Sequence, residues 1–150
     1  MQQIPNADLK EFLSGNSKTK AAFAKKIGRS FQEIGFLALR GHFLEDKLQD
    51  DLYKEIHSFF KLSNKIKSSY EIKGGGGQRG YTGFGKEHAA GRSIGDLKEF
   101  WHFGQYLEKD SKDFNYPKNI IIDEFSEFNK AGHDTYKALE KTGIYVLRAI

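Results

Sequence analysis

Cysteine is absent from this chain of 150 residues, which excludes a disulfide framework and a thiolate metal site. No stretch of the sequence approaches the roughly 18 consecutive apolar residues of a membrane span. The N-terminus carries Asp8, Lys10 and Glu11 where a secretory signal would need an apolar run. We therefore expect a soluble, cytoplasmic protein with no membrane partner.

The charge is nearly balanced and shows no stripe of one sign. The chain has 24 Lys and Arg against 20 Asp and Glu, a formal net charge of +4. Basic residues are interleaved with acidic ones, as in Lys10-Glu11 and Lys98-Glu99, and this pattern is typical of a solvated surface. A nucleic-acid partner is therefore not expected.

Two helical patterns flank a short apolar stretch in the first part of the chain. The first helix is expected to begin with Ser17 as its cap and to turn these residues inward: Phe23, Ile27, Phe31 and Ile34. The second runs from Leu44 to Phe60. Residues 35–39 between them are apolar and too few for a helix, so they predict a buried strand.

Four consecutive glycines, Gly74–Gly77, form the only low-complexity segment. Patterned sequence lies on both sides, so we expect a mobile loop within the fold. Residues 79–85 and 100–103 that follow are rich in aromatic residues and predict strands. Strand alternation places Phe100 and His102 on one face and the neighbouring aromatic residues, Trp101 and Phe103, on the other.

A long final helix is expected from Pro117 onward. Its inner stripe would contain Phe125, Phe128, Gly132, Tyr136, Leu139, Gly143, Val146 and Ile150. This stripe reaches Ile150 with no helix stop signal, so we expect Val146, Leu147 and Ile150 to lie in an exposed apolar patch. The pattern as a whole predicts an α+β piece of a larger fold, and the exposed patch predicts self-association through the final helix.

Several segments, in the correct order, resemble the N-terminal region of isopenicillin N synthase-like dioxygenases. The matching blocks are Ile4–Leu9, Phe31–Leu39, Phe59–Leu62 with Lys65 and Lys67, Gly80-Tyr81, and Asp96–Phe100 with Phe103-Gly104. Together they cover nearly the entire chain. Two positions depart from the family pattern: His42 is followed by Phe43 rather than Gly, and Ser63 replaces a usual Pro.

The resemblance implies a distorted double-stranded β-helix, or jelly roll, of which residues 1–150 are the helix-rich, non-metal-binding N-terminal domain, incomplete at the C-terminus. The catalytic jelly-roll half is then expected beyond residue 150, as the missing partner of this segment. In that family a His-x-Asp pair and a distant His hold iron(II), and an Arg-x-Ser binds 2-oxoglutarate. Such a triad leaves iron positions open for the oxoacid and O2 in the oxidation of a small organic substrate.

This segment lacks those metal and oxoacid motifs. The five histidines are His42, His57, His88, His102 and His133, and none has Asp or Glu two places later. No Arg has Ser two places later. His133-Asp134 are adjacent on a helix and point about 100° apart, so they cannot chelate one metal. We therefore expect no catalytic or metal-binding residue here, no cofactor bound by this segment and no activity from it alone.

Residues after the glycine run are the candidates for contact with a small-molecule substrate. Arg79 beside the phenol of Tyr81 could hold a substrate carboxylate by charge-assisted hydrogen bonds, with Gln78 and Thr82 next to them. Phe100 and His102 could face the same pocket. The alternative for each is ordinary: Arg79 is solvated, Tyr81 packs in a strand and His102 is a satisfied core histidine.

Three other functions compete with this interpretation. Residues 79–84 are similar to the start of an RNA-recognition strand, but that motif needs Gly or Ala at Thr82. The glycine run lacks the Lys-Ser/Thr that follows a phosphate-binding loop. The third alternative is a stand-alone, non-catalytic interaction or regulatory domain derived from the same fold.

Overall fold

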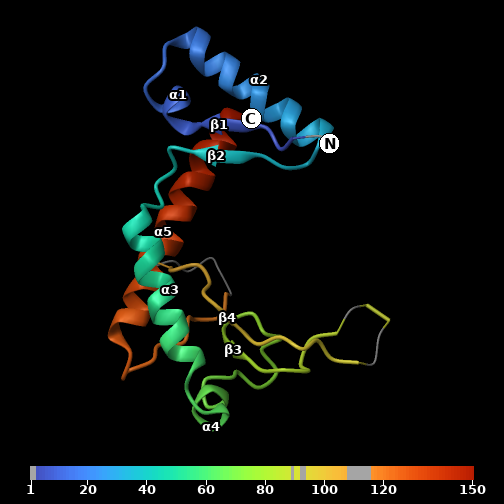
Figure 1. Cartoon of the computed structure of the whole chain (residues 1–150), viewed down its shortest axis with the longest axis vertical. Helices are drawn as coiled ribbons and strands as arrows, with labels where there is room; N and C mark the ends of the chain where they lie inside the picture. Colours follow the sequence, from blue (N-terminus) through green and yellow to red (C-terminus); the bar gives the residue numbers. More distant parts are fainter. Residues whose placement is uncertain (1–2, 89, 92–93, 108–115) are drawn as a thin grey trace. The chain divides into compact units, whose positions relative to one another are not determined.

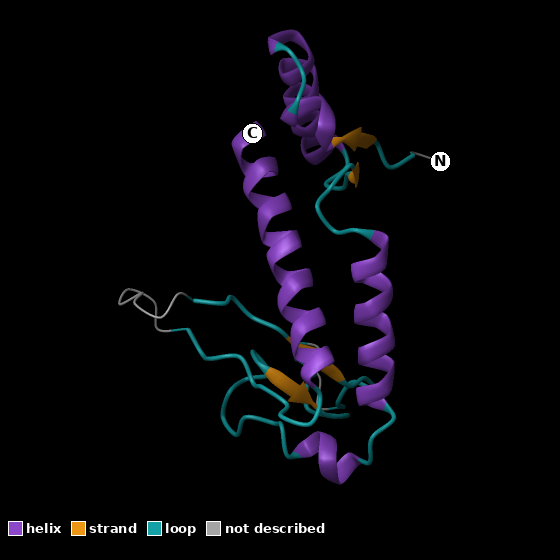
Figure 2. Ribbon diagram, turned by 90° about the vertical axis from the view of Figure 1, so that its left-hand side faces the viewer, coloured by secondary structure: helices purple, strands orange, loops and turns teal. Residues whose placement is uncertain are grey.

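The computed structural model describes residues 3–88, 90–91, 94–107 and 116–150 (Figure 1). It divides into two compact units, each with its own hydrophobic core. Unit 1 comprises Met1–Asp46 with Lys137–Ile150, and unit 2 comprises Lys47–Tyr136. Helices make up most of the regular structure and the strands are short (Figure 2).

Unit 1 is built around two parallel strands. Its elements are β1 (Asn6–Asp8), α1 (Leu9–Leu13), α2 (Ser17–Glu33), β2 (Ala38–Arg40) and the last turns of α5 (Ser126–Ala149). The strands pair in the register Asn6–Ala38, Ala7–Leu39 and Asp8–Arg40. The buried centre of the unit is formed by Ala7, Leu9, Phe23, Ile27 and Ala149.

Helix α2 follows its predicted apolar pattern with two differences. Phe23 and Ile27 are completely buried, as expected, but Phe31 is 43% exposed. The N-cap is Asn16 rather than Ser17, because the Asn16 side chain accepts a hydrogen bond from the Thr19 amide at 3.0 Å. The cap therefore lies one residue earlier than the pattern indicates.

The prediction of a buried strand at residues 35–39 is wrong in position and in burial. The strand β2 begins at Ala38, whose side chain is exposed like that of Arg40, while Leu39 between them is half-buried. A sheet of two short strands is covered on one face only, so alternate residues of β2 meet solvent.

Unit 2 joins two helices to an antiparallel strand pair. Its elements are α3 (Asp46–Phe60), α4 (Asn64–Ser68), β3 (Gly80–Thr82), β4 (Phe100–His102) and the first turns of α5. The strands pair in the register Gly80–His102, Tyr81–Trp101 and Thr82–Phe100. Ser63, which departs from the family pattern, caps α4 by accepting a hydrogen bond from the Ile66 amide.

An aromatic cluster forms the core of unit 2, with Phe59 at its centre. Its ring centroid lies 5.0 Å from that of Trp101 and 5.2 Å from that of Phe128. Trp101 and Phe103 face this core, whereas the Phe100 and His102 rings lie together on the other side of β4, 4.7 Å apart. The predicted alternation along β4 is therefore confirmed.

Helix α5 begins at Ser126, not at Pro117 as predicted. The Asn129 side chain accepts a hydrogen bond from the Ile122 amide and donates one to the Ile122 carbonyl, at 3.0 and 2.7 Å. These bonds hold the preceding segment in a non-helical path against the first turn. The inward stripe is also wrong in part: Phe128 is buried, but Leu139 is 52% exposed.

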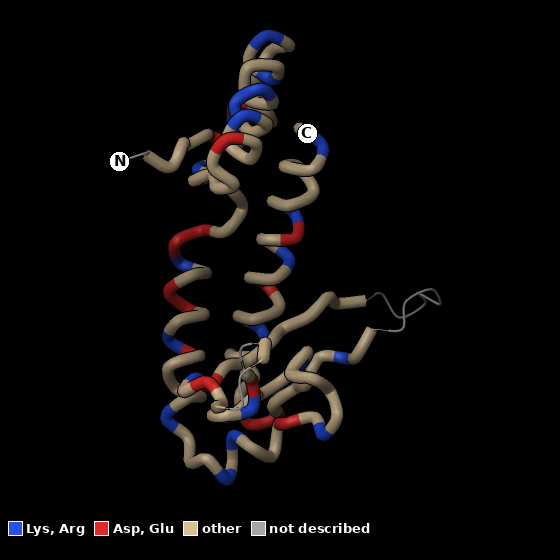
Figure 3. Tube along the Cα trace, turned by 90° about the vertical axis from the view of Figure 1, so that its right-hand side faces the viewer, with Lys and Arg blue, Asp and Glu red and all other residues tan. Residues whose placement is uncertain are grey.

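The described residues contain four strands in two two-stranded sheets, together with the helices, so an α+β class is observed. The jelly roll stays a prediction. Along α3, acidic and basic residues are interleaved (Figure 3). In the described part of the chain, no helix combines the length and the apolarity that a bilayer crossing demands.

Two helical glycines predict opposite effects of substitution by alanine. A Cβ on Gly132 would overlap the Phe103 ring, which is itself packed against Trp101 and Phe128. We expect Gly132→Ala to lower the free energy of unfolding by about 1–3 kcal/mol through overpacking. A Cβ on exposed Gly28 meets nothing outside its helix, so Gly28→Ala should raise that free energy by about 0.5–1 kcal/mol. Urea titrations of both variants check the signs, and a stabilising Gly132→Ala would contradict the packing.

Candidate functional site

A pocket of about 420 Å³ lies beside the glycine run in unit 2. It is lined by Glu71, Ile72, Lys73, Gly74, Gly76, Gly77, Arg79, Tyr81, Thr82, Lys86 and Glu87. Three of the predicted substrate-contacting residues, Arg79, Tyr81 and Thr82, are among these. The other three, Gln78, Phe100 and His102, are not.

The glycine run is shaped by turns that require glycine. Gly74, Gly76 and Gly77 have φ values of 73°, 57° and 69°, in the left-handed region that side chains disfavour. The Gly75 amide donates to the Ile72 carbonyl and the Gln78 amide to the Gly75 carbonyl, at 3.0 and 3.2 Å. The run is therefore a defined wall of the pocket, and its mobility stays a prediction.

The Arg79 side chain is half-buried and lies against the backbone of Gly104. A Cβ on Gly104 would overlap the guanidinium, so this contact requires a glycine there. Asn119 fixes Gly104 from the other side, accepting from the Gly104 amide at 2.6 Å and donating to its carbonyl at 3.0 Å. Nη1 of Arg79 donates to the Gln78 carbonyl at 2.6 Å, whereas its buried Nε has no partner among the described residues.

Tyr81 is 3% exposed, and its hydroxyl is committed to a buried ion pair. The hydroxyl donates to Oε2 of Glu99 at 2.6 Å, and Nζ of Lys67 donates to the same carboxylate at 2.8 and 2.6 Å. Burial, followed by the hydrogen bond to Glu99, holds the pKa of Tyr81 far above its usual value. Tyr81 therefore stays protonated, with its proton directed at Glu99 and not available to a ligand.

Glu99 is kept ionised in this cluster. Its burial acts to raise its pKa, but the hydrogen bonds from Lys67 and Tyr81 outweigh that effect, and the pKa of Glu99 lies below its usual value. The Lys67 side chain is only 4% exposed and also donates to the Phe60 carbonyl at 3.4 Å. The sequence analysis placed Lys67 and Glu99 in matching blocks and took Glu99 as part of a solvated surface, so it missed that the two residues meet.

Thr82 adds a second polar group without a partner at the pocket wall. The residue is 5% exposed, and its Oγ1 has no hydrogen-bond partner among the described residues. Of the other charged residues that line the pocket, Lys86 pairs with Glu71 at 3.4 Å, and Glu87 pairs with Lys98 at 2.7 Å. Lys73 is an exposed cation on the lining, whereas Arg79 is half-buried. Arg79 thus supplies a cation whose donors complement a small anion, with a hydroxyl nearby.

The remaining predicted residues lie outside the pocket. Gln78 is exposed, and its carbonyl accepts the bond from Arg79. The exposed His102 ring is hydrogen-bonded through Nδ1 to the carbonyl oxygen of Gly77 and packs on Phe100. His102 therefore contacts Gly77, which lines the pocket, without lining the pocket itself.

Within the described residues, no group of three or more His, Asp or Glu side chains is placed to hold a metal ion. His133 hydrogen-bonds Asp134 at 2.9 Å, and Asp134 also pairs with Lys130 at 2.7 Å on the surface of α5. That this segment binds no iron(II) stays a prediction, and a titration of the chain with iron(II) would test it. The described residues do not fit an iron(II) triad, so no step of oxygen activation is assigned to them.

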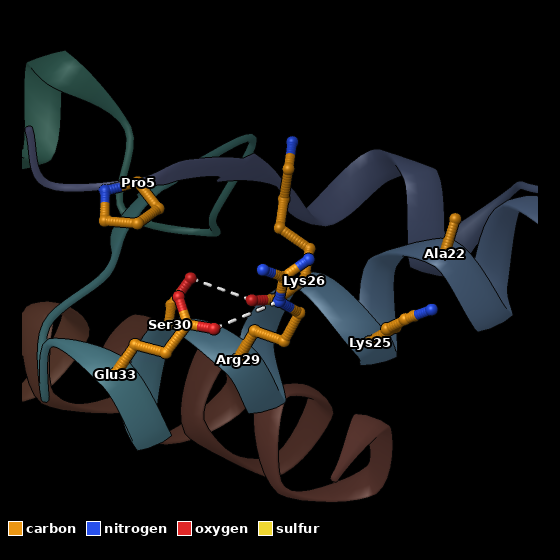
Figure 4. Close-up of a pocket in the computed structure, with 7 residues that line it drawn as sticks. All are labelled: Pro5, Ala22, Lys25, Lys26, Arg29, Ser30 and Glu33. Atoms are coloured by element: carbon orange, nitrogen blue, oxygen red, sulfur yellow. Dashed lines mark hydrogen bonds and ion pairs between the residues drawn. The ribbon is translucent and has the colours of Figure 1, made fainter.

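A second pocket, of about 370 Å³, lies in unit 1 between α2 and the start of β1 (Figure 4). Its lining residues are Pro5, Ala22, Lys25, Lys26, Arg29, Ser30 and Glu33. Arg29 donates to Glu33 at 3.3 Å, and Ser30 donates to the Lys26 carbonyl at 2.8 Å. No sequence pattern indicated this pocket. Because Arg29 pairs with Glu33, the cations of the lining without an ion pair among the described residues are Lys25 and Lys26.

Residues 4–124 match the family described as the N-terminal domain of the non-haem dioxygenases in morphine synthesis. The chain belongs to this family. It is 24% identical, over 99% of its length and 47% of the relative's, to the 2-oxoglutarate-dependent dioxygenase caaD of Aspergillus niger. It is 30% identical over 88 residues, 58% of the chain and 24% of the relative, to the 2-oxoglutarate-dependent dioxygenase imqE of Aspergillus flavus.

Solved structures agree with this assignment. A putative 2OG-Fe(II) oxygenase family protein from Caulobacter crescentus superimposes with a TM-score of 0.82 at 31% identity, over 100% of this chain and 48% of that one. A full-length protein of Neurospora crassa, solved in complex with alpha-KG, gives a TM-score of 0.77 at 26% identity, over 98% and 46%. The chain thus spans less than half the length of these relatives. The predicted resemblance to the N-terminal region of such dioxygenases is confirmed.

Proposed function

We propose that this chain is the non-metal-binding half of an iron(II) oxygenase that oxidises a small organic substrate with O2 and 2-oxoglutarate. The relatives described as 2-oxoglutarate-dependent support the cosubstrate. In this proposal a C-terminal jelly-roll half holds the iron and the oxoacid. The pocket beside the glycine run forms one side of the substrate mouth, in an enzyme of the cytoplasm.

The observation that carries the substrate role is a pair of unused polar groups in one pocket. Arg79 has a buried Nε, and Thr82 has a buried hydroxyl, neither with a described partner. Buried polar groups are normally satisfied, so such pairs point to a ligand or an ordered water. A carboxylate suits such a lining, because it accepts hydrogen bonds from a guanidinium and from a hydroxyl. Tyr81 contributes a wall, since its proton is held by Glu99.

A titration of the chain with acetate tests this role. We expect acetate to shift the Nε–H resonance of Arg79, and Arg79→Gln to weaken binding by roughly ten-fold or more, because a charge-assisted hydrogen bond is lost. Lys61→Gln removes an equal charge from an exposed position outside the pocket and should leave binding unchanged. Nuclear magnetic resonance titration measures both constants.

A second variant separates the position of Arg79 from its charge. Gly104→Ala keeps the guanidinium but fills the space that it occupies, so acetate binding should weaken as in Arg79→Gln. Gly83→Ala is the matched control, because its Cβ makes only ordinary contacts, at 3.4 Å or more. Equal acetate affinity in the wild type, Arg79→Gln and Gly104→Ala would refute the carboxylate site.

An interaction or regulatory domain with the same fold is the second candidate. The observation in its favour is exposed apolar surface in the last turn of α5 and directly after it, where Leu147 is 74% and Ile150 is 72% exposed. The two candidates predict different results when a C-terminal half is added to the chain. A C-terminal half that binds it and restores oxygenase activity supports the enzyme, and binding without activity supports the interaction domain.

A further inference from the structure

We propose that His102 is a positioning residue that latches the glycine run over the strands β3 and β4 and so holds one wall of the pocket. The importance of that wall rests on the proposed function, but the latch itself is a matter of local geometry. His102 lies outside the pocket and acts through Gly77, which lines it.

The register of the two strands brings the parts of the latch together. His102 lies opposite Gly80 and Phe100 lies opposite Thr82 on the antiparallel pair. A Cβ on Gly77 would lie 3.1 Å from Oγ1 of Thr82 and 3.7 Å from Cζ of Phe100. The glycine run therefore folds back onto the strand face that carries Phe100 and His102, away from the aromatic core.

The other hydrogen bonds around the run lie within its turns or at its ends. The Gly75 amide donates to the Ile72 carbonyl, and a bridge between Glu71 and Gly80 closes the loop at its base. The Gln78 amide donates to the Gly75 carbonyl, but this bond lies within the turn and does not attach it to the strands. Within the described residues, the His102 ring is the side chain that bonds the Gly77 carbonyl. Because glycine carries the greatest backbone freedom of any residue, one anchor to a strand has a large effect on the order of this segment.

The chemistry of the bond fixes the state of the ring. A carbonyl oxygen only accepts, so Nδ1 of His102 must carry the hydrogen. The ring is therefore either the Nδ1–H tautomer or the doubly protonated form, and both make the bond. The Phe100 ring, 4.7 Å away, holds the imidazole in the orientation that points Nδ1 at the loop.

Nitrogen-15 spectra of the 150-residue chain test the proposal directly. At a pH where His102 is neutral, the wild type should show the Nδ1–H tautomer. The Gln78 N–H shares a peptide plane with the Gly77 carbonyl, so its order parameter reports the anchor. We expect an order parameter of about 0.85, typical of rigid backbone, in the wild type. In His102→Leu the order parameter should fall to roughly 0.6 or below.

Two further variants serve as controls. His102→Asn places an amide donor close to the position of Nδ1 and should keep most of the order at Gln78. His57→Leu removes another exposed histidine, on α3, and should change nothing in the glycine run. Amide shifts of Tyr81 and Trp101 report whether each variant keeps the strand pair. The wild-type tautomer tests the bond to Gly77 even if His102→Leu does not fold, and His102→Asn then reports the order of the run.

The outcomes separate the latch from the proposed function. An Nε2–H tautomer in the wild type, or an unchanged Gln78 order parameter in folded His102→Leu, overturns the latch. Acetate binding to the wild type that weakens about five-fold or more in His102→Leu supports the latch and the pocket together. A confirmed latch in a chain that does not bind acetate keeps the positioning role and refutes the carboxylate site alone.

Discussion

Lys67→Met is expected to lower the free energy of unfolding by about 3–5 kcal/mol, because it leaves the buried carboxylate of Glu99 without its counter-ion. Nζ of Lys67 contacts both oxygens of that carboxylate, and its side chain is almost fully buried. In the variant, Tyr81 alone would hydrogen-bond the charge. One phenol does not replace an ammonium in an apolar cluster.

The double variant distinguishes a buried charge from lost packing. Lys67→Met with Glu99→Leu removes both charges and should recover a large part of the loss, because an apolar pair needs no counter-ion. Lys65→Met, two residues earlier on α4 and exposed, is the matched control and should have little effect. Trp101, the single tryptophan, lies in the adjoining aromatic core and reports urea unfolding by its fluorescence. Equal stability of the Lys67 and Lys65 variants would contradict the prediction.

The same pair predicts acid sensitivity. The pKa of Glu99 is lower in the folded chain than its ordinary value of 4.5, so the folded state favours the ionised form. The stability gained from this is present above pH 4.5 and is lost as the pH falls below that value through the folded pKa. Lys67→Met removes the larger of the two hydrogen-bonding contributions that lower the pKa of Glu99, the other being Tyr81, and should flatten the acid limb of the stability profile.

Local patterns predicted the parts of the fold that local chemistry decides. The helical spacing of Phe23 and Ile27 predicted α2 in unit 1. Strand alternation predicted that Trp101 and His102 lie on opposite faces of β4, with Trp101 toward the core. The start of α5 was missed because it depends on Asn129 bonding the backbone of Ile122, seven residues earlier. A hydropathy pattern contains no signal for such a side chain-to-backbone bond.

The site was predicted in part for the same reason. Arg79 and Thr82 follow the glycine run directly, so loop chemistry was enough to select them. The partners that fix the site are distant: Lys67 and Glu99 are 32 residues apart in the chain. Each looks like an ordinary charged surface residue in the sequence. Only the tertiary fold makes them a buried pair that holds Tyr81.

Leu147→Lys is expected to convert the chain from a self-associating species into a monomer without loss of stability. Leu139 and Leu147 are 52% and 74% exposed, and their helical spacing places them on one side of α5, while Ile150, directly after the helix, is 72% exposed. At about 25 cal/mol per Å² of apolar area, a face of this kind gains several kcal/mol when it is covered. Association of two copies is one way to cover it.

Val146 supplies the opposite control, because it does not lie in the exposed patch as the sequence suggested. It is half-buried against the core of unit 1, beside Tyr145 and Ala149. Val146→Lys should therefore lower the thermal midpoint, since it drives a charge into packed apolar surface, whereas Leu147→Lys should leave the midpoint unchanged. Sedimentation at several concentrations measures association, and calorimetry measures the midpoint.

A C-terminal half that packs on the same face would compete with self-association. Leu147→Lys should then weaken the binding of that half as well as the pairing of two copies, because one apolar face serves both. A wild-type chain that sediments as a monomer at every concentration, and that binds no apolar-surface dye, would show that the face is stable in water. In that case Leu147 and Ile150 are scattered surface residues, and a docking role must be sought on another part of the chain.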